Sequence, residues 1–408
     1  MKVAGIICEY NPFHLGHSRH IEMTRLALGG DCAIVGVMSG NFVQRGDFAI
    51  FNKHSRAGAA ISCGADLVVE LPAPYALSSA EGFARAGVHI LDMLGVCDAI
   101  SFGSESGDVG ALREVAEVIV SPEANRLIRE WLGKGLSFAS ARQKAADHVL
   151  GPKSELLKSP NNLLGVEYLK AIAELGSPLL PVTVARAGGE HDGSSGFSAT
   201  NIRKMMIQGK EPWDLMPESA ANACKGESAA GRGPVSLKQA ELAVLSRLRA
   251  AKDFSALPDA SEGLDRRLAR YAASEATVES ILEKVKTKRY AMSRLRRMLM
   301  CACLGITAQD ARALPPYIRV LAMNGAGMKL LAAARKKAGV PIITKPASVH
   351  RLSERAVRLF SIESGATDFY SLAYQDEKNR AGGREWRQDP IVASPAGAGS
   401  LTGSLTGA

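Results

Sequence analysis

The chain opens with an apolar run, a proline break and a helical pattern, and this order limits what the rest can build. Residues 3–8 carry no polar side chain except a thiol, which is typical of a buried strand. Asn11-Pro12 ends the strand, because proline cannot donate to a β-ladder and restricts the residue before it. Apolar residues of a helical pattern follow at Leu15, Ile21, Met23 and Leu26. The sequence therefore predicts a strand that connects within a few residues to a helix.

Two histidines, His14 and His17, lie at this junction with Gly16 between them. The free N–H groups and the positive dipole end of a helix N-terminus attract phosphate. Gly16 allows a close approach because it has no Cβ, and imidazoles three residues apart share a helix face and can donate hydrogen bonds. The same pattern would also arise from a His-x-x-His metal pair or from two exposed histidines without a role. The position after an N-terminal strand and Asn-Pro-Phe favours a nucleotide site.

The first half of the chain alternates apolar strands with amphipathic helices. Strands are expected at residues 3–8, 32–38, 66–71, 99–102 and 179–184, with helices near 17–28, 53–63, 80–94, 109–120, 122–132, 137–150 and 161–175. This order predicts an α/β fold with a Rossmann-like parallel sheet covered on both faces. Ligands bind beyond the carboxyl ends of such strands. His14 and His17 follow the first strand and Gly103 follows the fourth, so we expect them to meet over one pocket.

Two further loops carry polar residues at strand ends or helix starts. Arg45 lies in the glycine-flanked segment 39–47 after the second strand, where it could bind a phosphate or a carboxylate or simply be solvated. Asn161 and Asn162 follow Ser159-Pro160 at a helix start. A Ser or Asn cap explains one of these polar residues, and a nucleotide contact by one asparagine is the alternative.

A second phosphate site is expected after the last of these strands. Thr200 opens a helix, and its hydroxyl and the free N–H groups suit phosphates. Arg203 adds charge on the same face three residues later. An ordinary N-cap is the competing interpretation. His191 and Asp192, in the glycine-rich loop before this helix, could also line the pocket.

The overall charge points to a polyanionic partner. The formal net charge is +9 and the pI is about 9.2, which favours nucleic acid, with a membrane surface as the alternative. Seven scattered cysteines without a Cys-x-x-Cys pair indicate a reduced compartment and no zinc site. No signal peptide and no apolar run of about 20 residues are visible. We expect a cytoplasmic protein.

The composition changes after residue 210. We expect a catalytic domain at 1–210, a linker at 211–233, a mainly α-helical RNA-binding domain at 234–375 and a disordered tail at 376–408. Seven cations fall between Lys284 and Arg297 with few acids, a density that suits phosphate binding, although most charge runs are solvated faces. The expected RNA contacts are Lys288, Arg289, Tyr290, Arg294, Arg296 and Arg297, with Tyr290 stacking on a base. Lys329, Arg335, Lys336, Lys337, Lys345 and Arg351 are a weaker extension.

The segment Asn11-Pro-Phe-His-x-Gly-His17 resembles the signature of the nucleotidylyl transferase superfamily, whose members act on the α-phosphate of ATP. Preceded by Glu9-Tyr10, it is similar to the bacterial tRNA(Met) cytidine acetate ligase (TmcAL) family. Similar family segments are residues 38–46, 66–72, 102–105, 159–165 and 366–374, so the match runs to about residue 375. Residues 198–203 resemble the second superfamily motif, with Ala199 in place of one serine.

The resemblance implies that acetate is activated as acetyl-adenylate by ATP, with Mg²⁺ bridging the phosphates, and that the acetyl group passes to the 4-amino group of the wobble cytidine of elongator tRNA(Met). It assigns catalysis to His14, His17 and Arg203. It assigns nucleotide contacts to Ile7, Cys8, Glu9, Tyr10, Asn11, Pro12, Phe13, His14, Leu15, Gly16, His17, Ser18, Arg19, His20, Gly103, Asn161, Asn162, Arg186 and Thr200. No residue is assigned to a metal. An adenylyltransferase acting on a small phosphorylated metabolite and a non-catalytic RNA-binding protein remain the alternatives.

Overall fold

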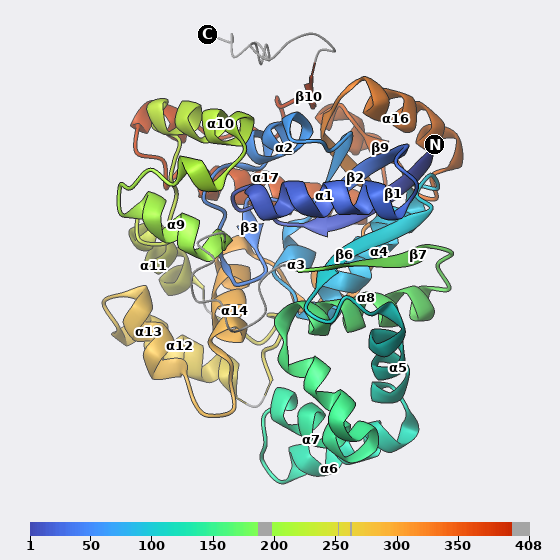
Figure 1. The fold of residues 1–408 in the computed structure, drawn as a ribbon. Helices are drawn as coiled ribbons and strands as arrows, with labels where there is room; N and C mark the ends of the chain where they lie inside the picture. Colours follow the sequence, from blue (N-terminus) through green and yellow to red (C-terminus); the bar gives the residue numbers. More distant parts are fainter. Residues whose placement is uncertain (187–197, 252, 262, 394–408) are drawn as a thin grey trace.

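A sheet of eight strands forms the centre of the molecule (Figure 1). The computed structural model describes residues 1–186, 198–251, 253–261 and 263–393. The strand order is β10-β8-β5-β2-β1-β6-β7, with β9 beside β8. The strands are β1 Lys2–Cys8, β2 Cys32–Ser39, β5 Leu67–Leu71, β6 Ala99–Ser104, β7 Leu180–Ala185, β8 Ile318–Met323, β9 Ile342–Ile343 and β10 Ile391–Val392. All pairs are parallel except β5 with β8, so the expected α/β class is confirmed.

Side chains of the central strands alternate between two hydrophobic clusters, as the period of two of a strand requires. On β2, Val35 and Val37 enter one cluster and Ile34 and Met38 the other. One cluster is shared with α4 Ala80–Met93, α5 Val109–Ile119, α8 Pro160–Leu175, α16 Gly325–Lys337 and α17 Glu354–Ser371. The other is shared with α1 Leu15–Ala27, α2 Lys53–Ser62, α9 Ala199–Ile207 and α10 Glu218–Ala229. Both faces of the sheet are therefore covered, as predicted.

Two groups of helices extend from this core (Figure 1). The first is the hairpin of α6 Pro122–Gly133 and α7 Phe138–Leu150, which has a small cluster of its own and is followed by the 3₁₀ segment η1 Gly151–Lys158. The second comprises α11 Glu241–Ala250, α12 Leu264–Ser274, α13 Val278–Val285 and α14 Met292–Leu304, and the short α15 Ala308–Arg312 follows it in the chain. The core of α11–α14 includes Phe42 and Phe48 of the loop after β2 and Phe369 of α17. These helices are thus packed directly on the segment that follows β2.

The remaining short elements lie mainly at the ends of longer ones. They are β3 Phe42–Val43, β4 Asp47–Phe48, α3 Ala73–Ala76, η2 Trp213–Leu215, η3 Pro346–Arg351 and η4 Glu377–Arg380. No helix in the described ranges is long and apolar enough to cross a bilayer.

The expectation that residues 234–375 are one mainly helical unit is wrong for their second half. Ile318–Met323 forms β8, all six residues of which are buried, and it pairs with β5 in the central sheet. This short apolar run becomes a strand because the exposed edge of β5 offers it hydrogen bonds and burial. Within the described part of residues 234–375, only α11–α15 lie apart from the sheet, whereas α16 and α17 pack against it.

Two segments expected to lack regular structure are ordered by packing. Residues 218–229 of the expected linker form α10, whose Ala220, Ala221 and Cys224 are buried beside α2. The expected tail carries η4 and β10 within 376–393, and Glu385 is 1% exposed. Small and polar residues suggested disorder, but packing on α2 orders the first segment. Ion pairs of Glu385 and the pairing of β10 with β8 order the second.

Candidate active site

His14 and His17 face each other in the first turn of α1. His14 is the N-cap residue, and its Nδ1 accepts a hydrogen bond from Gly16 N at 3.1 Å. His17 Nδ1 accepts from His14 N at 3.2 Å. The rings stack with their centroids 3.8 Å apart. Because both Nδ1 atoms accept, each neutral ring carries its proton on Nε2, which leaves two N–H donors just beyond the carboxyl end of β1.

The local environment keeps these imidazoles neutral. Burial, with help from Arg186 and Arg203, lowers the pKa of His14 to about 4. Burial and the neighbouring His14 and His20 place the pKa of His17 well below its usual value. His20 has its pKa lowered to about 4 by burial and Arg186, and its Nε2 lies 3.0 Å from Ser101 Oγ on β6. His20 therefore anchors α1 to the sheet, whereas the other two rings present donors.

Two aromatic residues of the motif pack against the ring of His17. Tyr10 and Phe13 are at most 2% exposed, and their ring centroids lie 4.9 Å and 5.4 Å from that of His17. Cys8 and Pro12 are buried as well, while Leu15, Gly16 and Arg19 are at least partly exposed. The continuous run from Ile7 to His20 thus divides into buried supports and accessible positions.

The second phosphate motif lies beside the first. Arg203 Nη1 donates to the carbonyl oxygen of Asn11 at 2.7 Å, and Nη2 donates to Thr200 Oγ1 at 3.1 Å. Arg45 Nη1 reaches the same hydroxyl at 3.4 Å. Ser198 caps α9 by accepting from Asn201 N, so Thr200 is not the cap. The structure thus brings together Thr200, Arg203, Arg45 and the histidine motif.

Buried Arg56 fixes the ends of β1 and β2 relative to each other. Its guanidinium donates to the carbonyl oxygens of Glu9, Ser39, Gly40 and Phe51. Glu9 in turn accepts from Gln44 N at 2.8 Å, and Asn11 Oδ1 accepts from Ile50 N at 2.7 Å. The loop that carries Arg45 is therefore tied to the histidine motif through its backbone. Sequence reasoning missed Arg56, because nothing in the sequence shows that its partners are carbonyls of other segments.

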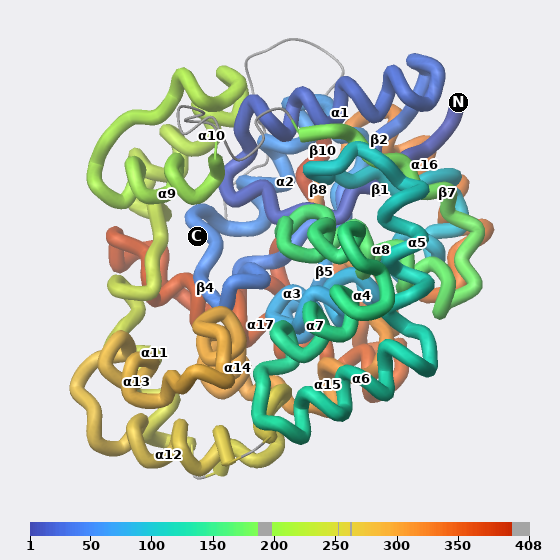
Figure 2. Tube along the Cα trace, turned by 60° about the horizontal axis from the view of Figure 1, so that its bottom comes forward, coloured from blue at the N-terminus to red at the C-terminus, as the bar shows by residue number. Residues whose placement is uncertain are grey.

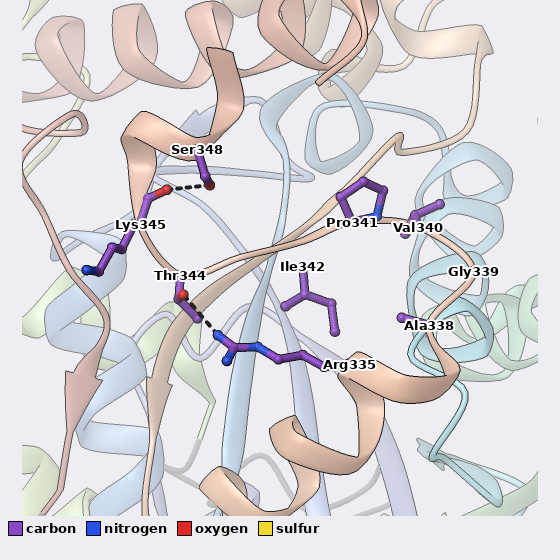
Figure 3. A pocket seen from close by; sticks show the side chains of 9 residues that line it. All are labelled: Arg335, Ala338, Gly339, Val340, Pro341, Ile342, Thr344, Lys345 and Ser348. Atoms are coloured by element: carbon purple, nitrogen blue, oxygen red, sulfur yellow. Dashed lines mark hydrogen bonds between the residues drawn. The ribbon is translucent and has the colours of Figure 1, made fainter. Parts of the chain in front are cut away.

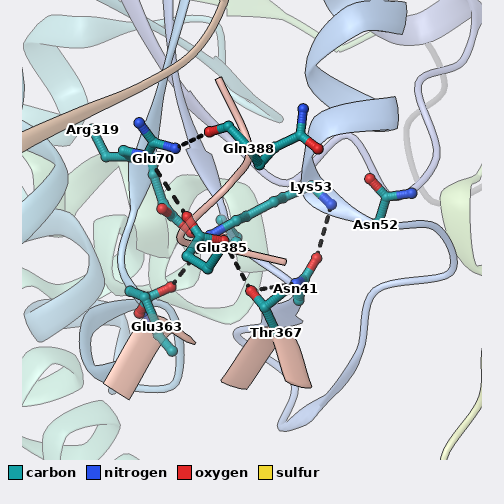
Figure 4. A network of polar contacts seen from close by, with 12 residues as sticks. Asn41, Asn52, Lys53, Glu70, Arg319, Glu363, Thr367, Glu385 and Gln388 are labelled. Carbon is teal, nitrogen blue, oxygen red and sulfur yellow. Dashed lines mark hydrogen bonds and ion pairs between the residues drawn. The ribbon is translucent and has the colours of Figure 1, made fainter. Parts of the chain in front are cut away.

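A network of buried charges lies behind the same loop (Figure 4). Lys53 Nζ lies 2.6 Å from Glu70, 3.8 Å from Glu363 and 2.8 Å from Glu385. Thr367 Oγ1 donates to Glu385 and accepts from Asn41 Nδ2, and Asn41 Oδ1 accepts from Lys53 N. Residues from α2, β5, α17 and the segment after η4 thus converge on Asn41 at the start of the loop.

Glu105 occupies the N-terminus of α8. Its carboxylate accepts from Asn161 Nδ2 at 2.6 Å and from Asn162 N at 2.8 Å, and Asn162 Oδ1 accepts from Ser106 N. Ser159 makes no cap hydrogen bond. The expected Ser or Asn cap is therefore replaced by Glu105, because a carboxylate suits the positive end of the helix.

Arg186 extends over β6 toward the histidines. Its Cγ would lie 3.3 Å from a Cβ placed on Gly103, so Gly103 makes room for this arginine. Arg186 also contributes to the lowered pKa of His14, His17 and His20. His191 and Asp192 lie outside the described residues.

The six residues expected to contact RNA are of two kinds: some are exposed, and the others interact with neighbouring parts of the fold. Lys288 and Arg289 are exposed. Arg294 donates to Asp259 O and Ser261 Oγ and covers Tyr290, which is 7% exposed. The other two arginines pair with acids: Arg296 with Asp47 at 3.5 Å and Arg297 with Asp259 at 3.8 Å. The charges of α14 therefore serve largely to join this helix to its neighbours.

The proposed extension of the basic segment lies elsewhere. Lys329, Arg335, Lys336 and Lys337 are on α16, on the side of the sheet away from α12–α14 in both views (Figures 1 and 2). A cavity of about 690 Å³ opens there between α16 and β9 (Figure 3). Arg335 donates to Thr344 in it, while Lys345 points away. This surface does not continue the one on α12–α14.

Comparison with known proteins agrees with this geometry. The family model described as "HIGH Nucleotidyl Transferase" matches residues 1–385, so the chain belongs to the class of HIGH nucleotidyl transferases. The tRNA(Met) cytidine acetate ligase of Acetivibrio thermocellus is 36% identical over 96% of this chain and 100% of its own length, and that of Caldicellulosiruptor saccharolyticus is 39% identical over 96% and 98%. The crystal structure of Thermotoga maritima TmcAL bound with alpha-thio ATP has a TM-score of 0.89 and 33% identity, covering 97% of this chain and all of that one.

The chain belongs to the tRNA(Met) cytidine acetate ligase family of HIGH nucleotidyl transferases. The resemblance seen in residues 9–17 is thereby confirmed.

Proposed function

We propose that this protein is an ATP-dependent ligase that activates acetate as acetyl-adenylate and acetylates the wobble cytidine of elongator tRNA(Met). The observation that carries the proposal is the pair of neutral imidazoles whose Nδ1 atoms accept backbone N–H groups. Their Nε2–H donors lie at the carboxyl end of β1, beside Thr200 and Arg203. The named activity of relatives that are 33–39% identical over most of the chain supports it.

In the first step, a carboxylate oxygen of acetate attacks the α-phosphorus of ATP, and pyrophosphate leaves. His14 and His17 donate to phosphate oxygens, and Arg203, with Arg45 nearby, balances the charge that develops on them. Holding the carboxylate and the α-phosphorus in line is the main task of the site. Mg²⁺ would neutralise part of the charge on the phosphates. The described residues include no cluster of three potential metal-ligating side chains, so we assign the ion no protein ligand.

In the second step, the 4-amino nitrogen of cytidine attacks the acetyl carbon, AMP departs with the bonding electrons, and the nitrogen loses a proton. An unpaired base can be turned out of its stack and read at its edge. The helices α11–α14 would hold the RNA near this site because they pack on the loop at residues 41–48.

The test is to incubate the protein with ATP, acetate and tRNA and to analyse the nucleosides by mass spectrometry and the nucleotides by chromatography. We expect acetylcytidine and AMP in equal amounts. Acetylcytidine that forms only with acetyl-coenzyme A would overturn the ligase proposal. ATP turnover with a small phosphorylated metabolite, in the absence of RNA, would support the adenylyltransferase alternative instead.

A further inference from the structure

A basic groove runs along α12, outside the nucleotide site. It has a volume of about 650 Å³ and is lined by one face of α12 and by the loop between α13 and α14. The lining residues are Gly263, Leu264, Arg266, Arg267, Arg270 and Tyr271 from α12 and the residue before it, and Thr287, Lys288, Arg289 and Tyr290 from the loop. Five of them are cations, and no acid lines the groove among the residues that the structure describes.

The spacing on α12 explains how this face arises. Leu264, Leu268 and Ala272 are buried at intervals of four residues, which turns Arg266 and Arg270 outward as an i, i+4 pair. Both arginines are exposed. Within the described part of the chain, neither has a hydrogen bond or an ion-pair partner, in contrast to the arginines of α14.

Tyr271 gives the groove a flat apolar surface. It is partly exposed, and the guanidinium carbons of Arg267 and Arg270 lie 5.4 Å and 5.5 Å from its ring centroid. Arg267 is held in place because it donates to the last carbonyls of α13, including Val285 O at 2.9 Å. Aromatic rings and arginine planes are the surfaces on which unpaired bases stack. Tyr290 is buried beneath Arg294, so it is the less accessible ring.

The groove is close to the loop at residues 41–48, which carries Arg45 and is called the catalytic loop below. The loop at 286–291 leads into α14, and Arg296, on the second turn of that helix, pairs with Asp47. At a rise of 1.5 Å per residue, the four residues from Met292 at the start of α14 to Arg296 span about 6 Å along the helix. An RNA strand that leaves the groove along α14 would therefore approach Arg45 and Thr200.

We propose that this groove binds an unpaired stretch of RNA that flanks the reacting nucleotide, with Arg266 and Arg270 on its phosphates and Tyr271 stacked on a base. The inference rests on the proposed function for the identity of the RNA. It places the RNA-binding charges on α12 and gives Arg294, Arg296 and Arg297 a mainly structural role.

The first experiment measures the affinity for a tRNA anticodon stem-loop over a series of salt concentrations. The double variant Arg266→Ala/Arg270→Ala should bind about tenfold or more weakly, and its log–log salt slope should fall by about 1 for each phosphate that the variant no longer neutralises. The matched control is Lys329→Ala/Lys336→Ala, which removes two exposed cations from α16. Equal binding by the two double variants would overturn the proposal.

The second experiment separates stacking from charge. Tyr271→Leu should weaken binding of the stem-loop by about 5-fold or more, whereas Tyr271→Phe should retain it. Neither should change binding of a blunt duplex RNA. A loss of affinity that is equal for loop and duplex would overturn the stacking role. If Tyr271→Leu does not fold, the comparison of the two double variants still decides the proposal.

ATP binding without RNA distinguishes a failure of the groove from a failure of the proposed function. The α12 variants should bind ATP as the unchanged protein does, because their side chains lie outside the histidine site. If the unchanged protein binds RNA in the groove but neither binds ATP nor consumes it with acetate, the proposed function fails and the groove stands. If ATP and acetate are consumed while the α12 variants bind RNA normally, the groove proposal is wrong and the proposed function remains.

Discussion

At the scale of single residues, the first turn of α1 fixes the tautomer of two imidazoles. Backbone N–H groups donate to the Nδ1 atoms of His14 and His17, and burial keeps both rings neutral. The rings therefore present hydrogen-bond donors to phosphate without the cost of burying two positive charges beside Arg186 and Arg203.

Replacing His17 by alanine should weaken ATP binding by about 10- to 100-fold, since a hydrogen bond to a charged group contributes roughly 1.5–3 kcal/mol. Isothermal titration with ATP measures this. The control is His148→Ala, because that histidine is exposed on α7. Similar affinities in the two variants would show that the His17 ring does not contact the nucleotide.

The same histidines make stability depend on pH. The pKa of His14 in the folded state is about 4, below its ordinary value of 6.5, so the unfolded chain binds more protons between these values. The free energy of unfolding should therefore fall as the pH drops from about 6.5 toward 4. His14→Asn should reduce this fall by up to about 3 kcal/mol. Urea unfolding at pH 7 and pH 4.5 tests the difference, and an unchanged pH dependence would contradict it.

At the scale of elements, the loop after β2 is confined by α14. Gly46 has a φ of +74°, and a Cβ there would lie 2.7 Å from Arg296 Cβ and even closer to the backbone of Arg296 and Arg297. Asp47 pairs with Arg296 in the same region. The catalytic loop and the start of α14 therefore cannot move apart without breaking both the close packing and the ion pair.

Gly46→Ala should lower the free energy of unfolding by more than the roughly 1–3 kcal/mol that a left-handed backbone costs a non-glycine residue. Gly209→Ala is the matched control, because Gly209 also has a φ of +74° but nothing lies within 4 Å of its Cβ position. The difference between the two, measured by urea unfolding, isolates the contact with α14. No difference would mean that α14 moves aside freely.

Local apolar and helical patterns in the sequence predicted the first half of the fold. The elements that these patterns missed depend on contacts with residues far away in the chain. The strands β1, β2, β5, β6 and β7 were found within about two residues, because each is a buried apolar run between helical patterns. β8 was missed because its place depends on the free edge of β5. The histidine motif, Thr200 and Arg203 were predicted to lie together, and they do. Glu105 and Glu385 were not found, since their roles exist only through contacts across the fold.

At the scale of the whole molecule, the cluster in Figure 4 joins the first and last described parts of the chain. Lys53 and Arg319 face three carboxylates, Glu70, Glu363 and Glu385. Burial and the nearby Glu70 raise the pKa of Glu363 well above its usual value. The positive charges of Lys53 and Arg319 outweigh burial and lower the pKa of Glu385 to about 2. Of these two carboxyl groups, Glu363 therefore retains a proton more readily than Glu385.

Lys53→Met should destabilise the protein by about 3–5 kcal/mol, because it leaves buried carboxylates without their cation. Lys153→Met, which breaks the exposed pair with Glu114, should cost at most about 1 kcal/mol. Urea unfolding compares the two variants. Equal losses of stability would show that the buried cluster contributes no more than a surface ion pair.

The position of Glu385 in the chain has a consequence for protein synthesis. All the residues that would contact ATP have left the ribosome long before this carboxylate is made, yet Asn41 depends on it through Thr367. A chain that terminates early would therefore carry a complete set of nucleotide ligands on a loosely held loop.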